Sequence, residues 1–244
     1  MTQYSYDLHI HSCLSPCGDD DMTPGNIAGM GSLNGLGIMA LTDHNTCGNC
    51  PAFFKACKTY GIVPVPGMEL TTSEDVHIIC LFPELENAME FDAMVGPRIM
   101  PIKNKPEIFG NQLYIGDDDE VCGSQERLLI SATDIDISRA IELVREYGGV
   151  CYPAHIDRPS NGIIAMLGDI PPEYGFRCVE FNDGANEAEY REKYAVVKDA
   201  RALVSSDAHQ LWAINEGTNK VGIDDEPYSS ALVRRRLLEM IAKG

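Results

Sequence analysis

Short apolar runs alternate with amphipathic stretches along most of the chain. The apolar runs predict β-strands over residues 4–10, 37–41, 62–65, 76–82, 150–152, 178–181 and 202–205. The stretches between them predict helices that begin at Pro24 and that span 51–60, 85–95, 134–147 and 229–242. Strands that alternate with helices in this way are typical of parallel βα units.

Residues 97–130 interrupt this alternation. Three prolines lie close together at its start, and the run Gly-Asp-Asp-Asp-Glu at 116–120 is typical of an exposed turn. We therefore expect an inserted hairpin here, which is either a lid that influences substrate choice or a decorated surface loop. No repeat or linker divides the chain, so the sequence predicts one α/β domain over residues 1–244.

The balance of charge is strongly acidic, with 19 basic and 37 acidic residues and a formal net charge of −18. Such a field repels nucleic-acid backbones and acidic membranes unless bound cations offset it locally. This favours a small phosphorylated substrate and predicts no stable nucleic-acid complex and no membrane partner. The odd count of nine cysteines and an N-terminus without an apolar signal segment favour a reduced, cytoplasmic protein.

The six histidines lie at or beside the ends of predicted strands. His9 and His11 alternate along the first strand, so both imidazoles can face one ion. Polar residues also follow later strands, in the motifs Thr-Asp-His-Asn at 42–45, Gly-Met-Glu at 67–69, Pro-Ala-His at 153–155 and Ser-Asp-Ala-His at 206–209. Because the carboxyl ends of barrel strands meet on one rim, these side chains are expected to gather there. His77 fits less well, since it begins its apolar run.

In type and order, these motifs resemble those of the polymerase and histidinol phosphatase (PHP) superfamily. The similarity covers nearly the whole chain. It implies a distorted (β/α)7 TIM-like barrel, with residues 97–130 as a small insertion, and an enzyme that hydrolyses phosphate esters with two or three divalent metal ions.

The resemblance also implies how the ligands are divided among the ions. The first ion would be held by His9, His11, Glu69 and Asp207; the second by Glu69, His77 and His155; the third by His44, His209 and one acidic residue after the first strand. For that last ligand, the family often has the Asp of an H-S-x-x-S-D-G stretch, where this chain has Pro16 at the simple offset. Asp19 is favoured by its distance from Thr23 and Pro24, and Asp20 and Asp21 are the alternatives.

Mixed imidazole and carboxylate ligands suit Zn²⁺, Mn²⁺ or Fe²⁺ better than Ca²⁺. A water shared by two ions bridged by Glu69 loses a proton near neutral pH and becomes the nucleophile. Asp207 and His209 are candidate proton donors to the leaving oxygen as well as ligands. Arg158 is a candidate to bind substrate phosphate, and a surface ion pair is the alternative.

Four cysteines fall in loops near the predicted rim. Cys13 and Cys17 follow the first strand, and Cys47 and Cys50 follow His44. They can assemble a four-thiolate metal site, act as a redox-sensitive pair, or pack independently as small apolar residues.

The predicted function is therefore metal-dependent hydrolysis of a phosphomonoester, such as a nucleotide or nucleoside bisphosphate. Alternatives that the same site would support are histidinol-phosphate phosphatase and an exonuclease or phosphodiesterase acting on oligonucleotides. The alternative outside enzymes is a regulatory metal-binding barrel, for which missing ligands would be expected.

Overall fold

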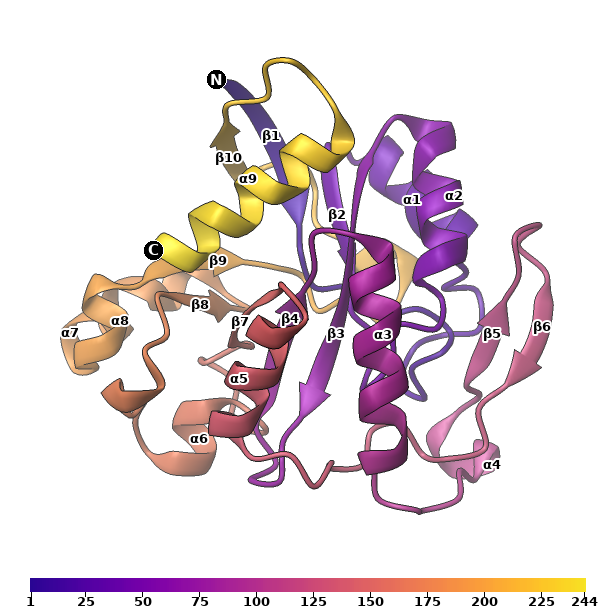
Figure 1. Ribbon diagram of the computed structural model, residues 1–244, viewed down its shortest axis with the longest axis horizontal. Helices are drawn as coiled ribbons and strands as arrows, with labels where there is room; N and C mark the ends of the chain where they lie inside the picture. The colour runs from indigo at the N-terminus through magenta and orange to yellow at the C-terminus, as the bar shows by residue number, and fades with distance from the viewer.

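A curled β-sheet forms the centre of the molecule in the computed structural model, which describes residues 1–244 (Figure 1). Its strands, in hydrogen-bonded order, are β10 (Lys220–Ile223), β1 (Thr2–Asp7), β2 (Ile38–Leu41), β3 (Val63–Thr71), β4 (His77–Leu81) and β7 (Val150–Pro153). A separate parallel pair, β8 (Cys178–Phe181) and β9 (Arg201–Val204), continues the curve beside β7. The fold is thus mixed α/β. Its sheet is a half-barrel in which the strand ladder is interrupted between β7 and β8. This agrees with the expected TIM-like fold but does not confirm the complete distorted (β/α)7 barrel.

The direction of β4 differs from the expected parallel arrangement. The first three strands run parallel, but β4 is antiparallel to both β3 and β7. The connection from Thr71 to His77 is a tight turn closed by the backbone N–H of Thr72 to the carbonyl of Val76, at 2.9 Å. Because so short a connection cannot make a crossover, the two strands form a hairpin. Strand β3 also extends beyond the predicted end at Val65 and includes Glu69.

Helices cover the sheet on both sides. The longer ones are α1 (Pro24–Leu33), α2 (Cys50–Tyr60), α3 (Leu85–Val95), α5 (Ile137–Glu146) and α9 (Ser230–Lys243). The shorter ones are α4 (Pro106–Phe109), α6 (Ile163–Leu167), α7 (Glu187–Lys193) and α8 (Ala195–Asp199), with single 3-10 turns η1 (Gly96–Arg98), η2 (Pro172–Tyr174), η3 (Gly184–Asn186) and η4 (Leu211–Ala213). The side-chain hydroxyl of Thr23 caps the N-terminus of α1, and the carboxylate of Asp136 caps that of α5. None of the helices has the length and apolar character needed to cross a membrane.

Two apolar cores lie on opposite faces of the sheet. Met39 and Leu41 of β2 pack in the core that α1, α2, α3 and α5 share, while Ile38 and Ala40 pack in the core closed by α9. This follows from the alternation of side chains along a strand. The apolar runs of β2 and β3 are buried on both faces, so the polar residues that these strands carry are confined to their ends and to the loops beyond.

The segment after α3 contains a hairpin of β5 (Leu113–Ile115) and β6 (Val121–Ser124), which lies at the edge of the molecule (Figure 1). Its turn is tied to the start of α1, because Asp119 accepts hydrogen bonds from the Thr23 hydroxyl and the Gly25 N–H. Its first strand is tied to the loop after β1 by the N–H of Leu113, which donates to the carbonyl of Cys13. These contacts hold the insertion against the loop after β1.

Candidate metal centre

Residues from six separate parts of the chain meet at one end of the sheet. His9 and His11 follow β1, His44 follows β2, Glu69 is in β3, His77 begins β4, His155 follows β7, and Asp207 and His209 follow β9. The antiparallel direction of β4 explains His77, since the start of β4 lies beside the end of β3, with His77 paired to Thr71. All of these residues are buried except His209, whose side chain is 26% exposed. The site therefore lies in the floor of a cavity with His209 nearer its opening.

The carboxylate of Glu69 is the centre of this cluster, because imidazoles surround both of its oxygens. Its Oε1 lies 2.8 Å from His77 Nδ1, 3.0 Å from His155 Nε2 and 3.4 Å from His9 Nε2, and its Oε2 lies 3.0 Å from His44 Nδ1 and 3.3 Å from His11 Nε2. The carboxylate of Asp207 stands opposite, with Oδ1 3.0 Å from His11 Nε2 and 3.3 Å from His9 Nε2. A single carboxylate with so many imidazoles around it has the position of a ligand shared between ions.

Hydrogen bonds fix the orientation of three imidazoles. His9 Nδ1 lies 2.7 Å from Glu180 Oε1, and His209 Nδ1 lies 2.8 Å from the carbonyl oxygen of Asp207; both partners only accept, so both Nδ1 atoms donate. His11 Nδ1 donates to the Ser15 hydroxyl at 3.0 Å, since that hydroxyl donates in turn to Asp43. The Nε2 atoms of all three rings are then left without a proton in the neutral form.

The donor atoms fit divalent cations. His9 Nε2 and His11 Nε2 lie only 3.1 Å apart, so they need a shared cation between them, either a proton on one ring or a metal ion. His44 Nδ1 and His77 Nδ1 face Glu69, and Asp207 Oδ1 faces His11, yet none of these buried atoms makes a well-aligned hydrogen bond. Buried polar atoms are rarely left without a hydrogen bond, and bound metal ions are the simplest partners for them here.

The ionisation of the site agrees with this fit. Burial acts to lower the pKa of His11, but Asp207 and Glu69 outweigh it and raise the pKa to about 9. Burial acts to raise the pKa of Glu69, but the charges of His77, His9 and His44 hold it well below its usual range. Burial lowers the pKa of His44 to about 4 and that of His209 to about 3. At neutral pH and without metal, the cluster thus combines anionic carboxylates with protonated His9 and His11 and neutral His44 and His209. Metal ions that bind to His9 and His11 would replace these protons.

The donor atoms form three overlapping groups, and within each group all atoms lie within 4.8 Å of one another. The groups are His9, His11, Glu69 and Asp207; His44, Glu69 and His77; and His11, Cys17, His44 and His209. The first group has the composition predicted for the first ion. His155 joins the second through its contact with Glu69.

The structure does not bring Asp19 into the cluster. Its backbone N–H donates to the carbonyl of His209 at 3.0 Å, but its side chain lies with Asp20 and Asp21 around a separate hollow. Cys17 takes the place expected for Asp19, beside His44 and His209. The chain turns tightly before Gly18, and this turn could not be inferred from the spacing to Thr23.

The four-thiolate site, one of three alternatives that the sequence left open for these cysteines, is not formed. All nine cysteines are unpaired, and Cys17 is the single cysteine in the metal-binding groups. Cys13 contacts the carbonyl of Leu113, whereas the thiols of Cys47 and Cys50 both point to the carbonyl of Gly67. These three are buried small side chains.

Arg158, the predicted phosphate-binding residue, lines the same cavity as Glu69, His77 and His155. Its guanidinium lies 2.6 Å from Asp207 Oδ2, so Arg158 forms an ion pair with a buried carboxylate of the cluster and not the surface ion pair that was the alternative. The side chain is 38% exposed, which leaves part of the guanidinium open to the cavity.

Three residues that orient the ligands were not among the site residues expected from the sequence, namely Glu180, Ser15 and Asp43. Glu180 accepts from both His9 Nδ1 and the N–H of His155, and is itself buried. A signal was present, because a glutamate interrupts the apolar run of β8, and an unpaired buried charge there would be costly. Asp43 lies in the Thr-Asp-His-Asn motif at 42–45, but the motif did not show that it orients His11 through Ser15, and Ser15 itself had no signal because serines are common in loops.

We predict that Glu180→Gln weakens binding of the ion held by His9 by about 10–100-fold. The neutral amide of glutamine is a weaker hydrogen-bond acceptor for the Nδ1 proton of His9 than the carboxylate, so the ring is held less firmly. Titration of the metal-free protein with Zn²⁺, followed by calorimetry, measures this. Equal affinity in the variant and the parent would contradict the orienting role.

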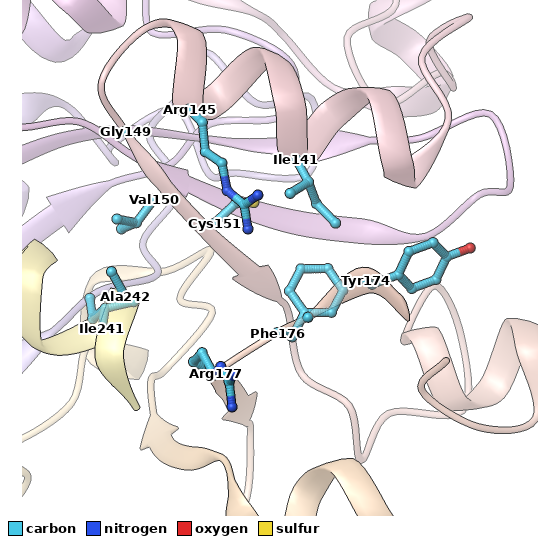
Figure 2. Close-up of a pocket in the computed structure, with 11 residues that line it drawn as sticks. Ile141, Arg145, Gly149, Val150, Cys151, Tyr174, Phe176, Arg177, Ile241 and Ala242 are labelled. Carbon is cyan, nitrogen blue, oxygen red and sulfur yellow. The ribbon is translucent and has the colours of Figure 1, made fainter. Parts of the chain in front are cut away.

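A second hollow lies away from the cluster, between α5, β7 and α9, and contains no histidine (Figure 2). Arg145 and Arg177 lie on opposite sides of it, with Phe176 and Tyr174 at its edge. Because it carries no carboxylate or imidazole, it is not a candidate for the metal chemistry.

Comparison with known proteins agrees with the site. The PHP domain family matches residues 7–97. Among solved structures, endonuclease Q from Pyrococcus furiosus has a TM-score of 0.70 and 18% identity, covering 99% of this chain and 56% of its own. Endonuclease Q in complex with a 27-mer duplex carrying an abasic lesion has a TM-score of 0.61 and 19% identity, covering 86% and 50%. A Bifidobacterium adolescentis protein assigned as a metal-dependent phosphoesterase has a TM-score of 0.59 and 20% identity, covering 95% of both chains. A search of curated proteins by sequence finds no match.

The predicted resemblance to the PHP superfamily is thus confirmed for residues 7–97, the part of the chain that matches the PHP domain family. The solved structures, at 18–20% identity, show that the fold is shared. The chain spans about half the length of the endonuclease Q chains.

Our prediction of a small phosphorylated substrate without a nucleic-acid partner is wrong. The similarity to endonuclease Q, one structure of which holds a DNA duplex, points to nucleic-acid substrates. The prediction failed because net charge averages over the whole surface, whereas bound divalent ions reverse the local sign where a phosphate would bind.

Proposed function

We propose that this protein hydrolyses phosphodiester bonds in nucleic acid with two or three divalent ions held around Glu69. The observation that carries the proposal is the cluster itself, in which one buried carboxylate meets five imidazoles at the floor of an open cavity. The likeness of nearly the whole chain to endonuclease Q supports nucleic acid as the substrate class.

His9, His11, Glu69 and Asp207 would hold the first ion, and Glu69, His77 and His155 the second. His44 and His209 would contribute to the third. When bound, Zn²⁺, Mn²⁺ or Fe²⁺ ions supply an activated water and neutralise the oxygens of the scissile phosphate. Glu69 would hold ions through both of its oxygens, each of which faces imidazoles, and this would be its catalytic role.

The negative charge of Asp207 and the hydrogen bond of His209 both favour a role in binding metal over a role in donating a proton. Burial acts to raise the pKa of Asp207, but His9 and His11 lower it well below its usual value, so the carboxyl carries no proton to give. His209 donates its Nδ1 proton to the carbonyl of Asp207, which leaves Nε2 to bind an ion. In this proposal, the proton for the leaving oxygen comes from solvent.

Arg158 would bind a phosphate oxygen next to the ions, because its guanidinium enters the cavity beside Asp207. We predict that Arg158→Ala lowers kcat/KM for the oligonucleotide by roughly 10–100-fold, the size of one lost charge-assisted contact. Arg158→Lys should recover only part of this, because ammonium lacks the planar fork. An effect of Arg158→Ala confined to thermal stability would indicate a structural ion pair only.

We also propose that the protein is located in the cytoplasm. All nine thiols are unpaired, which suits a reducing environment.

A cleavage assay tests the proposal. The protein, loaded separately with Zn²⁺, Mn²⁺ and Fe²⁺ under anaerobic conditions, is given end-labelled duplexes that are intact or carry one abasic site, the corresponding single strands, and p-nitrophenyl phosphate. We expect metal-dependent cleavage of at least one oligonucleotide. Turnover of the phosphomonoester with every oligonucleotide intact would overturn the proposal.

A further inference from the structure

Cys17 lies at the opening of the metal cavity, in the loop that follows β1. Its Sγ and one nitrogen from each of His11, His44 and His209 all lie within 4.8 Å of one another. The residue also borders the outer hollow formed by Asp19, Asp20 and Asp21. The thiol therefore stands between solvent and the imidazoles.

The imidazoles beside Cys17 point to a ligand independently of the cysteine. His44 is 3% exposed, and its Nδ1 faces Glu69 Oε2 at 3.0 Å without making a well-aligned hydrogen bond. His209 donates its Nδ1 proton to a backbone carbonyl, so its Nε2 carries a lone pair in the neutral form. A nitrogen of each of these two rings and the Cys17 sulfur lie within 4.8 Å of one another.

The loop holds Cys17 in this position. The N–H of Gly18 donates to the carbonyl of Ser15, and the N–H of Asp19 donates to the carbonyl of His209, each at 3.0 Å. A side chain at position 18 would collide with the carbonyl oxygen of Ser12, so this turn requires glycine. The turn directs Cys17 toward the histidines and the following acids outward.

We propose that Cys17, His44 and His209 form an ion position made only of sulfur and nitrogen ligands, and that this position selects Zn²⁺ over Mg²⁺ and Mn²⁺. His11 remains with the first ion, where it faces His9 and Asp207. Thiolate and imidazole are preferred by zinc, whereas Mg²⁺ and Mn²⁺ prefer oxygen ligands. Binding replaces the thiol proton with the ion, and the proton passes to solvent. Three protein ligands also leave one coordination position open toward the cavity. This inference rests on the metal centre of the proposed function and specifies one of its ions.

Cobalt spectroscopy tests the ligand directly and without substrate. The metal-free protein is titrated with Co²⁺, and the near-ultraviolet thiolate-to-cobalt charge-transfer band is recorded together with the number of ions bound per chain. We expect the band in the parent protein and its loss in Cys17→Ser, with at least a roughly tenfold weaker binding of one ion. Cys17→Asp should also lack the band but bind the full number of ions, with Mn²⁺ now competing against Zn²⁺ at that position.

Cys122→Ser is the matched control, because Cys122 is an exposed thiol in the β5–β6 hairpin outside the cluster. It should keep both the band and the metal content. A band that survives in Cys17→Ser, or a fully cobalt-loaded parent without one, would overturn the proposal. Because neither measurement involves turnover, a failure here is distinct from a failure of the nuclease assay.

Discussion

The variant Glu69→Gln is expected to lose nuclease activity by on the order of 10³-fold or more while keeping its fold. Glu69 is the one carboxylate within 3.4 Å of His9, His11, His44, His77 and His155, so it is positioned to hold two ions at once. A neutral amide offers one weak oxygen ligand and cannot bridge. Initial rates of oligonucleotide cleavage measure the loss, and elemental analysis should show at least one ion fewer per chain.

Glu146→Gln is a suitable control for this variant. Glu146 lies on the exposed side of α5, where its contact is with Arg139, and the same chemical change there should alter neither rate nor metal content. Circular dichroism of both variants checks that the fold is retained. Parental activity and metal content in Glu69→Gln would contradict the central role given to this residue.

Removal of metal is expected to destabilise the protein substantially. Without cations, the charges of Glu69 and Asp207 stay buried and are offset only by the imidazoles around them, where contacts such as those of His44 and His77 are not well-aligned hydrogen bonds. An ion present at about 1,000 times its Kd stabilises the folded state by about 4 kcal/mol. For a chain of this length, that corresponds to a fall in Tm of roughly 8–16 °C on chelation. Differential scanning calorimetry with and without chelator measures the difference.

Two comparisons make this result specific to the cluster. Adding Zn²⁺ back in excess of the chelator should restore Tm, and Glu69→Gln should respond to the chelator less than the parent. An unchanged Tm after complete removal of metal, verified by elemental analysis, would show that the cluster is stable as an ion-paired network of protonated histidines and carboxylates.

The residues of the site were largely predictable because metal chemistry restricts the choice of side chain. His9 and His11 alternate on one strand, and the motifs around His44, His155 and Asp207 each follow an apolar run. All of them lie in the cluster, together with Glu69, His77 and His209. What could not be predicted was the residue beside His44 and His209, because loop geometry places Cys17 there while Asp19 turns outward.

The fold was predictable in its elements but less so in their directions. The apolar runs locate most strands, and Thr23 with Pro24 and Gly61 mark the ends of helices. The extension of β3 through Glu69 and the antiparallel direction of β4 depend on a hairpin between them, which polar residues at 72–75 do not reveal by themselves. Strand β10 was missed because its four residues become a strand only by pairing with β1.

The six histidines, Glu69 and Asp207 are properties of the sequence, and with the strand pattern they predicted an α/β protein with a metal centre that resembles the PHP superfamily. Only the tertiary structure decided which atoms meet. Glu180 and Ser15 contact His9 and His11 from positions that the sequence pattern did not indicate, and a turn that requires glycine at position 18 brings Cys17 beside His44 and His209. The physical reason is that ligand type follows from local chemistry, whereas the convergence of lone pairs depends on loops whose paths are set by contacts between segments far apart in the chain.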